Sequence, residues 1–307
     1  MKIVLPVAGN GLRLRPYTEN VPKCLLPVAG KTILDWIVED TLFLKPTETI
    51  FITGYKAEVV DQFLTKRPDW GKTRTVVQSN PQGLGEAISL SLPFVSDDEP
   101  LLIILGDTMF EADLSILQNE QENVLYTFKV ADPKRFGVAV TDTAGRIQRL
   151  VEKPQEFVSD EAIVGIYYIK DVKVLKENLR FLMENDIRTK NEFQLTDALE
   201  MMIQKGCKFH TAPVGKWLDC GLAETLLETN AQVLARNDNS ASVSAEGCKI
   251  IAPCHIGKNV KLVNSTIGPN VAIGDNAVVE NSTLKDAVVW DDVKVIDKNL
   301  SDAIVHE

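Results

Sequence analysis

Residues 6 to 31, PVAGNGLRLRPYTENVPKCLLPVAGK, place a glycine-rich turn and a run of cations directly after a short apolar segment. The stretch holds Arg13, Arg15, Lys23 and Lys31 against one acid, Glu19, in a chain of 307 residues with a formal net charge of −10. Cations gathered in one segment of an acidic chain favour a small anionic ligand. Duplex nucleic acid or an anionic membrane would need a broad basic face, so we expect neither as a partner.

Around this stretch, β-branched runs alternate with helical patterns. Strands are predicted at 2–7, 49–55, 74–79 and 100–107, and apolar residues recur at helical spacing at 33–44 and 57–67. This alternation is typical of βαβ units. Continuously apolar strands such as LLIIL are buried on both faces, so the sheet is predicted to be mostly parallel and covered by helices. Ligands then bind at the carboxyl ends of its strands.

The second half of the chain begins with longer strands and then turns helical. Strands are predicted at 122–130, 136–142, 147–154 and 162–170, and helices at 172–185, 194–206 and 222–238. The polar segment RNDNSAS, residues 236–242, is a candidate linker.

An internal repeat follows this segment. Apolar residues recur at steps of 6, 6 and 5, which gives a period of 17 residues, and IGKNVKLVNST returns as IGDNAVVENST at that offset. One inward apolar residue per hexapeptide, with Gly, Asn or Asp at the corners, is typical of a triangular parallel β-helix. The predicted inward residues are Ile250, Ile256, Leu262, Ile267, Ile273, Val279, Leu284, Trp290 and Ile296.

The open ends of such a β-helix need a cap or a partner. Trp290 and the Val288–Val289 pair are expected to leave apolar surface on a lone stack of coils. We therefore expect a homo-oligomer in which the tails pack against neighbouring subunits.

The N-terminus and the cysteines bear on the compartment. The first nine residues hold an apolar run too short for a signal peptide, so a cytoplasmic protein is expected. Five cysteines, an odd number with no C-x-x-C pair, suggest neither a disulfide framework nor a structural metal site.

The turn at GNG matches neither of two common phosphate-binding motifs. No G-K-[ST] follows it, and Leu14 stands where a dinucleotide fingerprint has its third glycine. The backbone at Gly9 and Gly11 can still approach a ligand closely, with Arg13 and Lys23 nearby in the sequence. A solvated basic loop would look the same, so GNG alone does not decide.

The co-linear motifs decide between these readings. GNGLRLRPYT and PKCLLPVAGK are followed in order by QSNPQGLGEAI, ILGDTMF, LVEKP, IVGIYYI and KWLDCG. In order and spacing this set resembles the sugar-1-phosphate nucleotidylyltransferases over about residues 1 to 235. The resemblance implies a Rossmann-like α/β nucleotidyltransferase domain with a mixed, mostly parallel sheet at 1–238. A C-terminal hexapeptide-repeat, left-handed parallel β-helix is expected at 239–307.

The reaction that the resemblance implies joins two polyanions. An oxygen of a sugar-1-phosphate attacks the α-phosphate of a nucleoside triphosphate, and pyrophosphate leaves. Arg13 would hold the leaving pyrophosphate and Lys23 would bridge the reacting phosphates. Asp107 and Asp219 would hold Mg²⁺, a hard cation that takes few protein oxygens and several phosphate oxygens.

The resemblance also implies two sets of binding residues. The nucleotide-binding residues would be Ala8, Gly9, Gly11, Gln78 and Gly83, the last two at the base. The sugar-phosphate-binding residues would be Gly137, Glu152, Lys153 and Gly165, with Lys153 on the phosphate and Glu152 on a sugar hydroxyl.

The choice of nucleotide stays open at this point. Ala8 within PVAG is similar to bacterial UDP-glucose pyrophosphorylases, whereas RLRPYT and LLPVAGK are more similar to thymidylyltransferases. The family often has a hydroxyl residue at the position of Leu12 and Thr at that of Cys220. The amide of Gln78 suits the imide edge of uracil or thymine, so dTTP or UTP is expected, with glucose-1-phosphate.

Other functions remain possible from the sequence. One is a guanylyltransferase that acts on mannose-1-phosphate or another sugar phosphate. Another is a catalytically silent, nucleotide-sugar-binding regulatory subunit, against which the presence of Arg13, Lys23, Asp107 and Asp219 argues. A β-helix that also acetylates an amino sugar is disfavoured, because the tail is short and His255 is its one internal histidine.

Overall fold

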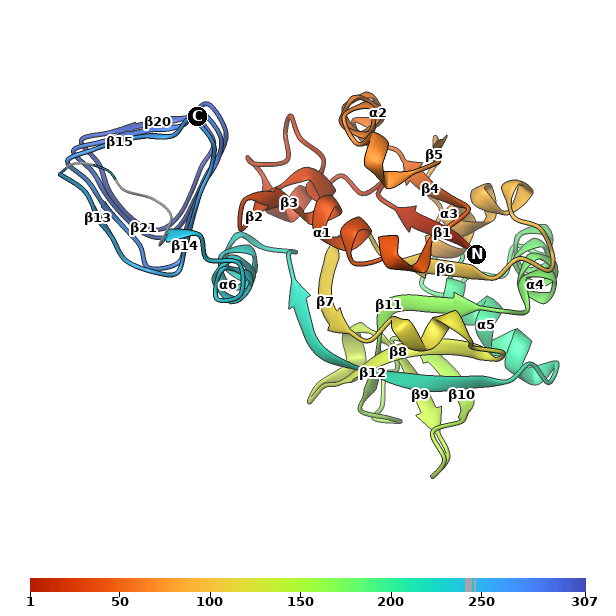
Figure 1. Cartoon of the computed structure of the whole chain (residues 1–307). Helices are drawn as coiled ribbons and strands as arrows, with labels where there is room; N and C mark the ends of the chain where they lie inside the picture. Colours follow the sequence, from red (N-terminus) through yellow and green to blue (C-terminus); the bar gives the residue numbers. More distant parts are fainter. Residues whose placement is uncertain (241–244, 246) are drawn as a thin grey trace. The chain divides into compact units, whose positions relative to one another are not determined.

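The computed structural model describes residues 1–240, 245 and 247–307. Contacts divide the chain into two compact units, drawn together in Figure 1. The first unit comprises Met1–Asn10 and Ile37–Trp217, and the second comprises Gly11–Trp36 and Leu218–Glu307. The predicted boundary after residue 238 stays a prediction, because contacts do not tell which segments fold alone. The last two residues of the candidate linker, Ala241 and Ser242, lie outside the described residues.

A ten-stranded sheet forms the centre of the first unit, and eight of its strands follow the order β5-β4-β1-β6-β11-β8-β12-β7. Its strands are β1 (Lys2–Pro6), β4 (Glu48–Thr53), β5 (Thr73–Val77), β6 (Leu101–Ile104), β7 (Thr108–Ala112), β8 (Asn123–Lys129), β9 (Gly137–Thr141), β10 (Ile147–Glu152), β11 (Glu161–Ile169) and β12 (Phe209–Asp219). β1 pairs in parallel with β4 and β6, and β4 with β5, whereas β11 runs antiparallel to β6 and β8. The predicted mixed, parallel-rich α/β sheet is confirmed.

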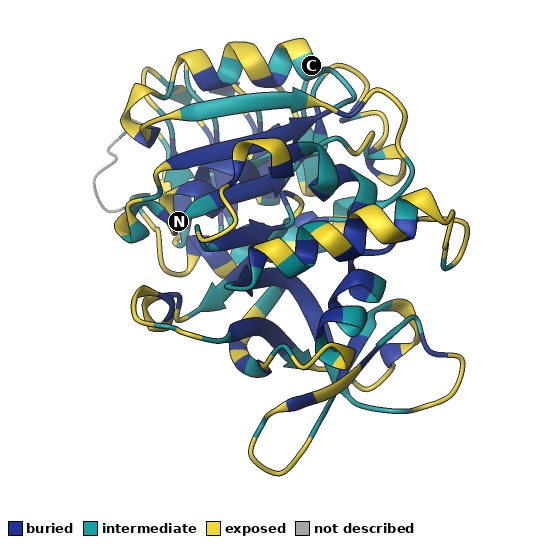
Figure 2. Ribbon diagram, turned by 90° about the vertical axis from the view of Figure 1, so that its right-hand side faces the viewer, coloured by how far each residue is buried: buried dark blue, intermediate teal, exposed yellow. Residues whose placement is uncertain are grey.

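Amphipathic helices cover this sheet. They are α2 (Ala57–Thr65), α3 (Leu84–Ser91), α4 (Val172–Glu184) and α5 (Leu195–Gln204), while α1 (Ile33–Glu39) spans the division between the units. α4 buries Val172, Leu175, Leu179 and Leu182, the spacing of one helix face, in the same core cluster as strand residues such as Ile103. Figure 2 shows dark blue strands beside helices whose turns alternate between blue and yellow.

Some elements differ from the sequence-based expectation. The helix predicted at 33–44 ends at Glu39, and residues Leu42–Leu44 form the separate 3-10 helix η3. α3 and β12 were not expected, because Gly85 lowers helix propensity and Pro213 and Gly215 are unusual inside a strand. Packing overrides these local preferences.

The C-terminal part of the second unit is a parallel β-helix, as predicted. Its strands are β13 (Lys249–Ile250), β14 (Cys254–Ile256), β15 (Lys261–Val263), β16 (Thr266–Ile267), β17 (Val271–Ile273), β18 (Val278–Glu280), β19 (Thr283–Val289), β20 (Lys294–Ile296) and β21 (Asn299–Val305). These strands pair in parallel from coil to coil, and Figure 1 shows their triangular outline. The left hand of the coils stays a prediction.

The corners of the coils explain the repeating Asn and Asp. These residues occupy the left-handed region, with φ between 44° and 63°: Asn259, Asn264, Asn270, Asn276, Asn281, Asp286, Asp292, Asp297 and Asp302. Their side chains bond from coil to coil, as in the ladder in which Asn259 donates to Asn276 at 3.2 Å and Asn276 donates to Asp292 at 3.1 Å. The corners are thus set by local sequence.

One corner shortens the repeat. Three residues lie between Ile267 and Val271, but two lie between Leu284 and Ala287. β14 therefore pairs with β17 at an offset of 17 residues, and β17 with β19 at an offset of 16.

This deletion moves the inward positions of the last coil by one residue. Val289 and Val295 are buried, Trp290 is half-buried and Ile296 is exposed. The prediction that Trp290 and Ile296 point inward is therefore wrong, because the 17-residue period does not continue past the short corner.

The helix α6 (Ala223–Leu234) covers a face of the coils. It packs against β17, β19 and β21, and also against β2 (Pro27–Val28), which pairs with β3 (Lys31–Thr32) in a short hairpin. Val288 and Val289 are each 1% exposed. The prediction that this pair leaves apolar surface exposed is therefore wrong. The homo-oligomer stays a prediction, without the support of an exposed Val288–Val289 pair.

Two further observations concern the whole described chain. None of its helices is long and apolar enough to cross a membrane. All five cysteines are described, and none of them forms a disulfide.

Candidate active site

The turn after β1 is held against the end of β4. The carbonyl of Ala8 accepts a hydrogen bond from the Tyr55 N–H at 3.2 Å, and a Cβ on Gly54 would lie 2.8 Å from the Ala8 Cβ. A Cβ on Gly9 would meet nothing within 4 Å. Packing therefore does not require glycine at position 9, and the bare backbone there is open to an approaching ligand.

Gly11 begins the second unit and lies against Lys23. It has φ 58°, and a Cβ there would lie 2.9 Å from the Thr18 methyl carbon and 3.2 Å from the Lys23 Cβ. The buried Thr18 hydroxyl donates to the Gly11 carbonyl at 2.8 Å. The spacing of residues within GNGLRLRPYT therefore has a packing reason, because it brings Gly11, Thr18 and the start of PKCLLPVAGK together.

The two predicted catalytic cations lie in short 3-10 helices of the second unit. Arg13 is exposed in η1 (Leu12–Leu14), and Lys23 is half-buried at the start of η2 (Lys23–Leu25). Arg15, just after η1, is exposed. The structure brings Lys23 to Gly11, whereas the Arg13 side chain is exposed.

The predicted base-binding residues flank the start of α3. Gln78 is buried, and its amide donates to the Glu86 carboxylate at 2.5 Å, which fixes the side chain. Gly83 has φ 121°, and a Cβ there would lie 2.6 Å from the Phe193 carbonyl oxygen. Glu86 also accepts from the Gln82 N–H at 3.3 Å, so it organises this segment, and sequence reasoning missed it although it stands inside the quoted motif QSNPQGLGEAI.

Three of the four predicted sugar-phosphate residues meet in the first unit. Glu152 lies 3.4 Å from the Lys153 ammonium, and a Cβ on Gly137 would come within 2.9 Å of the Glu152 carboxylate. Gly137 therefore leaves room for that carboxylate. Gly165, with φ 88°, lies instead against Leu105, two residues before Asp107. The Gly165 carbonyl accepts a hydrogen bond from the Leu105 N–H at 2.9 Å.

The start of α5 adds residues that sequence reasoning did not assign to the site. The Thr196 hydroxyl donates to Glu152 at 2.8 Å. Burial raises the pKa of the neighbouring Asp197, a hydrogen bond with Thr189 lowers it, and the Glu152 carboxylate raises it further. Burial also raises the pKa of Tyr167, with a smaller contribution from Glu152. From the sequence, the segment QLTDAL predicts only a helix, because its polar residues fit a helix start equally well.

The two predicted metal carboxylates belong to different units, and each is exposed. Asp107 follows β6 and accepts from the Thr108 hydroxyl at 3.3 Å. Asp219 ends β12, accepts from the Gly221 N–H at 2.8 Å, and its carbonyl accepts from the Thr229 hydroxyl at 2.9 Å. The described residues contain no group of three or more His, Cys, Asp or Glu that could hold a metal. Exposed carboxylate oxygens nevertheless suit Mg²⁺, which keeps water and phosphate oxygens as its other ligands.

Comparison with known proteins identifies the family of this chain. Residues 2–236 match the nucleotidyl transferase family. The chain belongs to this family. The predicted resemblance is thereby confirmed, together with the prediction that the chain is an enzyme of the nucleotidyl-transferring class.

Several named relatives are similar to this chain. The low-salt glycan biosynthesis nucleotidyltransferase Agl11 of Haloferax volcanii is 33% identical over 242 residues, covering 76% of this chain and 66% of that protein. The glucose-1-phosphate thymidylyltransferase of Streptomyces antibioticus is 28% identical over 316 residues, with 94% and 87% covered. The bifunctional protein GlmU of Methanocaldococcus jannaschii is 34% identical over 244 residues, with 76% and 54% covered.

Solved structures show the same fold. A UDP-glucose pyrophosphorylase complexed with UDP-glucose matches with a TM-score of 0.64 at 22% identity, covering 76% of this chain and 98% of that one. A putative glucose-1-phosphate thymidylyltransferase of Bacillus anthracis in complex with a sucrose matches with a TM-score of 0.64 at 27% identity, with 76% and 94% covered.

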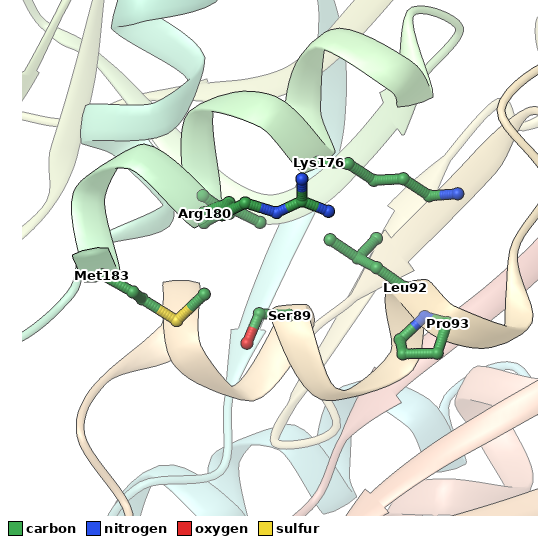
Figure 3. Close-up of a pocket in the computed structure, with 7 residues that line it drawn as sticks. Ser89, Leu92, Pro93, Lys176, Arg180 and Met183 are labelled. Atoms are coloured by element: carbon green, nitrogen blue, oxygen red, sulfur yellow. The ribbon is translucent and has the colours of Figure 1, made fainter.

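A separate cleft of about 400 Å³ lies between α3 and α4 in the first unit (Figure 3). Leu92, Leu179 and Met183 line it together with Lys176 and Arg180. The Lys176 ammonium is engaged by the Asp97 carboxylate at 2.6 Å. None of the predicted site residues lines this cleft, so it is distinct from the candidate active site.

Proposed function

We propose that this enzyme makes a nucleotide-diphospho-sugar and pyrophosphate from dTTP or UTP and a sugar-1-phosphate, with glucose-1-phosphate as the preferred sugar. The family match and the thymidylyltransferase relative support this choice. The observation that carries it is the packing of Gly11 with Thr18 and Lys23. This packing gives the spacing of GNGLRLRPYT and PKCLLPVAGK a structural reason, which it would not have in an unstructured basic loop.

On this proposal, the loop residues handle the phosphates. One residue, Asn10, lies between Gly9 and Gly11, so the chain keeps their α-carbons within about 7 Å, and their backbone amides would bind the triphosphate. Arg13 would hold the leaving pyrophosphate and Lys23 the reacting phosphates, so that charge is stabilised where it develops. No covalent nucleophile is required.

The remaining residues would select the substrates and hold the metal. Gln78, oriented by Glu86, and the backbone at Gly83 would contact the base. Glu152, oriented by Thr196, would accept a hydrogen bond from a sugar hydroxyl, and Lys153 would bind the phosphate. Asp107 and Asp219 would hold Mg²⁺, which when bound neutralises charge on the α-phosphate.

A panel assay tests the proposal. Purified protein with Mg²⁺ is offered dTTP, UTP, GTP, ATP and CTP, each with glucose-, galactose-, mannose- and N-acetylglucosamine-1-phosphate, and pyrophosphate release is measured. We expect the highest rate with dTTP or UTP and glucose-1-phosphate. A preference for GTP and mannose-1-phosphate would support the guanylyltransferase alternative. Nucleotide-sugar binding without pyrophosphate release from any pair would support the silent regulatory subunit.

A further inference from the structure

His306, directly after the last strand of the β-helix, contacts the loop between η1 and η2 through its ring. The His306 ring lies edge-on to Tyr17, with ring centroids 5.1 Å apart and planes at 79°. The same ring lies against Trp290, with centroids 5.6 Å apart. All three residues belong to the second unit, although Tyr17 and His306 are nearly the whole chain apart in sequence.

The hairpin that follows the loop is held by the tail at a second place. The buried Asn230 side chain accepts from the Ala29 N–H at 2.9 Å and donates to the Asn270 carbonyl at 3.2 Å. The His255 ring fills the space beside Gly30, where a Cβ would lie 2.2 Å from its Nε2. The second PVAG segment, residues 27–30, therefore packs against the coils and against α6.

Tyr17 is adjacent in the chain to Thr18, the residue that bonds to Gly11. Thr18 follows it, donates to the Gly11 carbonyl at 2.8 Å, and places its methyl group beside the position that a Gly11 Cβ would take. The Lys23 Cβ lies at the same position. Tyr17 is therefore linked through its neighbour Thr18 to Gly11, beside which the Lys23 Cβ lies.

We infer that His306 is a positioning residue of the reaction: the β-helix, through the His306 ring on Tyr17, holds the loop that carries Arg13 and Lys23. This inference rests on the proposed function for the reaction that the loop serves. The regular structure in this segment, residues 12–25, consists of two 3-10 helices of three residues each, so its own backbone bonds give it little stability. Small misplacement of phosphate-binding groups lowers turnover strongly.

Three full-length variants test the inference. His306→Ala removes the ring, and His306→Phe keeps a ring at the same place. Val305→Ala removes partly buried volume at the adjacent residue, the last of β21, and leaves the His306 ring in place. Hydrogen–deuterium exchange is followed at residues 12–26, because loop ordering can be measured whether or not the substrates are correctly assigned. Turnover and KM are measured with the best substrate pair.

We expect faster exchange at residues 12–26 and a fall in kcat of about tenfold for His306→Ala, with the KM for the sugar phosphate unchanged. His306→Phe should restore both to near the wild-type values, and Val305→Ala should leave both near them. Unchanged exchange in His306→Ala, equal effects in Val305→Ala, or faster exchange with an unchanged kcat would each overturn the inference. A wild-type protein that is inactive with every pair would instead refute the proposed function, and the exchange comparison would still decide whether the tail orders the loop.

Discussion

Asn230 of α6 accepts a hydrogen bond from the backbone N–H of Ala29 at 2.9 Å, although 201 residues separate the two in the chain. Its amide also donates to the Asn270 carbonyl at a β-helix corner. The fully buried side chain of Asn230 therefore joins the second PVAG segment (residues 27–30), the helix α6 and a coil of the β-helix.

Asn230→Ala should lower the free energy of unfolding by about 1 to 3 kcal/mol, because it leaves the buried Ala29 N–H without its acceptor. Urea unfolding of the full chain measures the change. Asn237→Ala is the matched control, since Asn237 is exposed and its side chain donates to the Val233 carbonyl one turn away in α6. Equal losses in the two variants would contradict the bridging role of Asn230.

Arg13→Ala and Lys23→Ala should each lower turnover by about 10²- to 10³-fold, by analogy with the loss of one preorganised donor. The fold should persist, because Arg13 is exposed and Lys23 is half-buried. Arg15→Ala, also exposed, is the control and should be nearly silent. Pyrophosphate release under saturating substrates gives the rates, and comparable activity in all three variants would identify a solvated loop instead of a phosphate site.

Asp107→Asn and Asp219→Asn should each raise the Mg²⁺ concentration needed for half-maximal activity by at least about tenfold. The amide keeps the shape of the side chain but lacks the charge that binds a hard cation. The measurement is a Mg²⁺ titration at fixed ionic strength, with Asp69→Asn, at an exposed aspartate, as the control. Superimposable titrations of wild type and both variants would refute the metal assignment.

Glu152→Gln should raise the KM for the sugar phosphate by about tenfold and leave the KM for the nucleotide near the wild-type value. Gly137→Ala should have a similar effect, because the added methyl group would come within 2.9 Å of the Glu152 carboxylate and displace it. If the nucleotide KM rose instead, Glu152 would belong to the nucleotide site.

The stability of the first unit should fall at acid pH through Glu48. Burial raises the pKa of this carboxyl, but hydrogen bonds from Lys2, Arg74 and Lys72 outweigh it and lower the pKa from 4.5 to about 2. Because the folded-state pKa is the lower one, this stabilisation is complete above about pH 4.5 and is lost as the pH falls toward 2.

Glu48→Gln should therefore be less stable than wild type at pH 7 by about 2 to 3 kcal/mol, and the difference should shrink as the pH falls from 4.5 toward 2. Urea unfolding at pH 7, 4 and 3 measures it. Glu58→Gln, at an exposed helix position, is the control. A difference between Glu48→Gln and wild type that does not change with pH would show that Glu48 acts through packing alone.

The sequence by itself determined the features that depend on short-range patterns. The strands of the parallel sheet follow from continuous apolar runs, since such runs are stable only when both faces are covered. The β-helix follows from its period, because each coil repeats one local pattern and its Asn and Asp corners adopt the left-handed conformation on their own. The co-linear motifs were also enough to predict the family.

Only the tertiary structure decided which distant segments meet. The short corner before Ala287 shifted the register, so Val289 instead of Trp290 faces the core, a one-residue change that apolar spacing alone did not reveal. Thr196 joined Glu152, and Glu86 joined Gln78, because packing brings their elements together. Residues 11–36 grouped with the β-helix for the same reason. A contact such as that of Tyr17 with His306 depends on how whole elements pack, which no local pattern encodes.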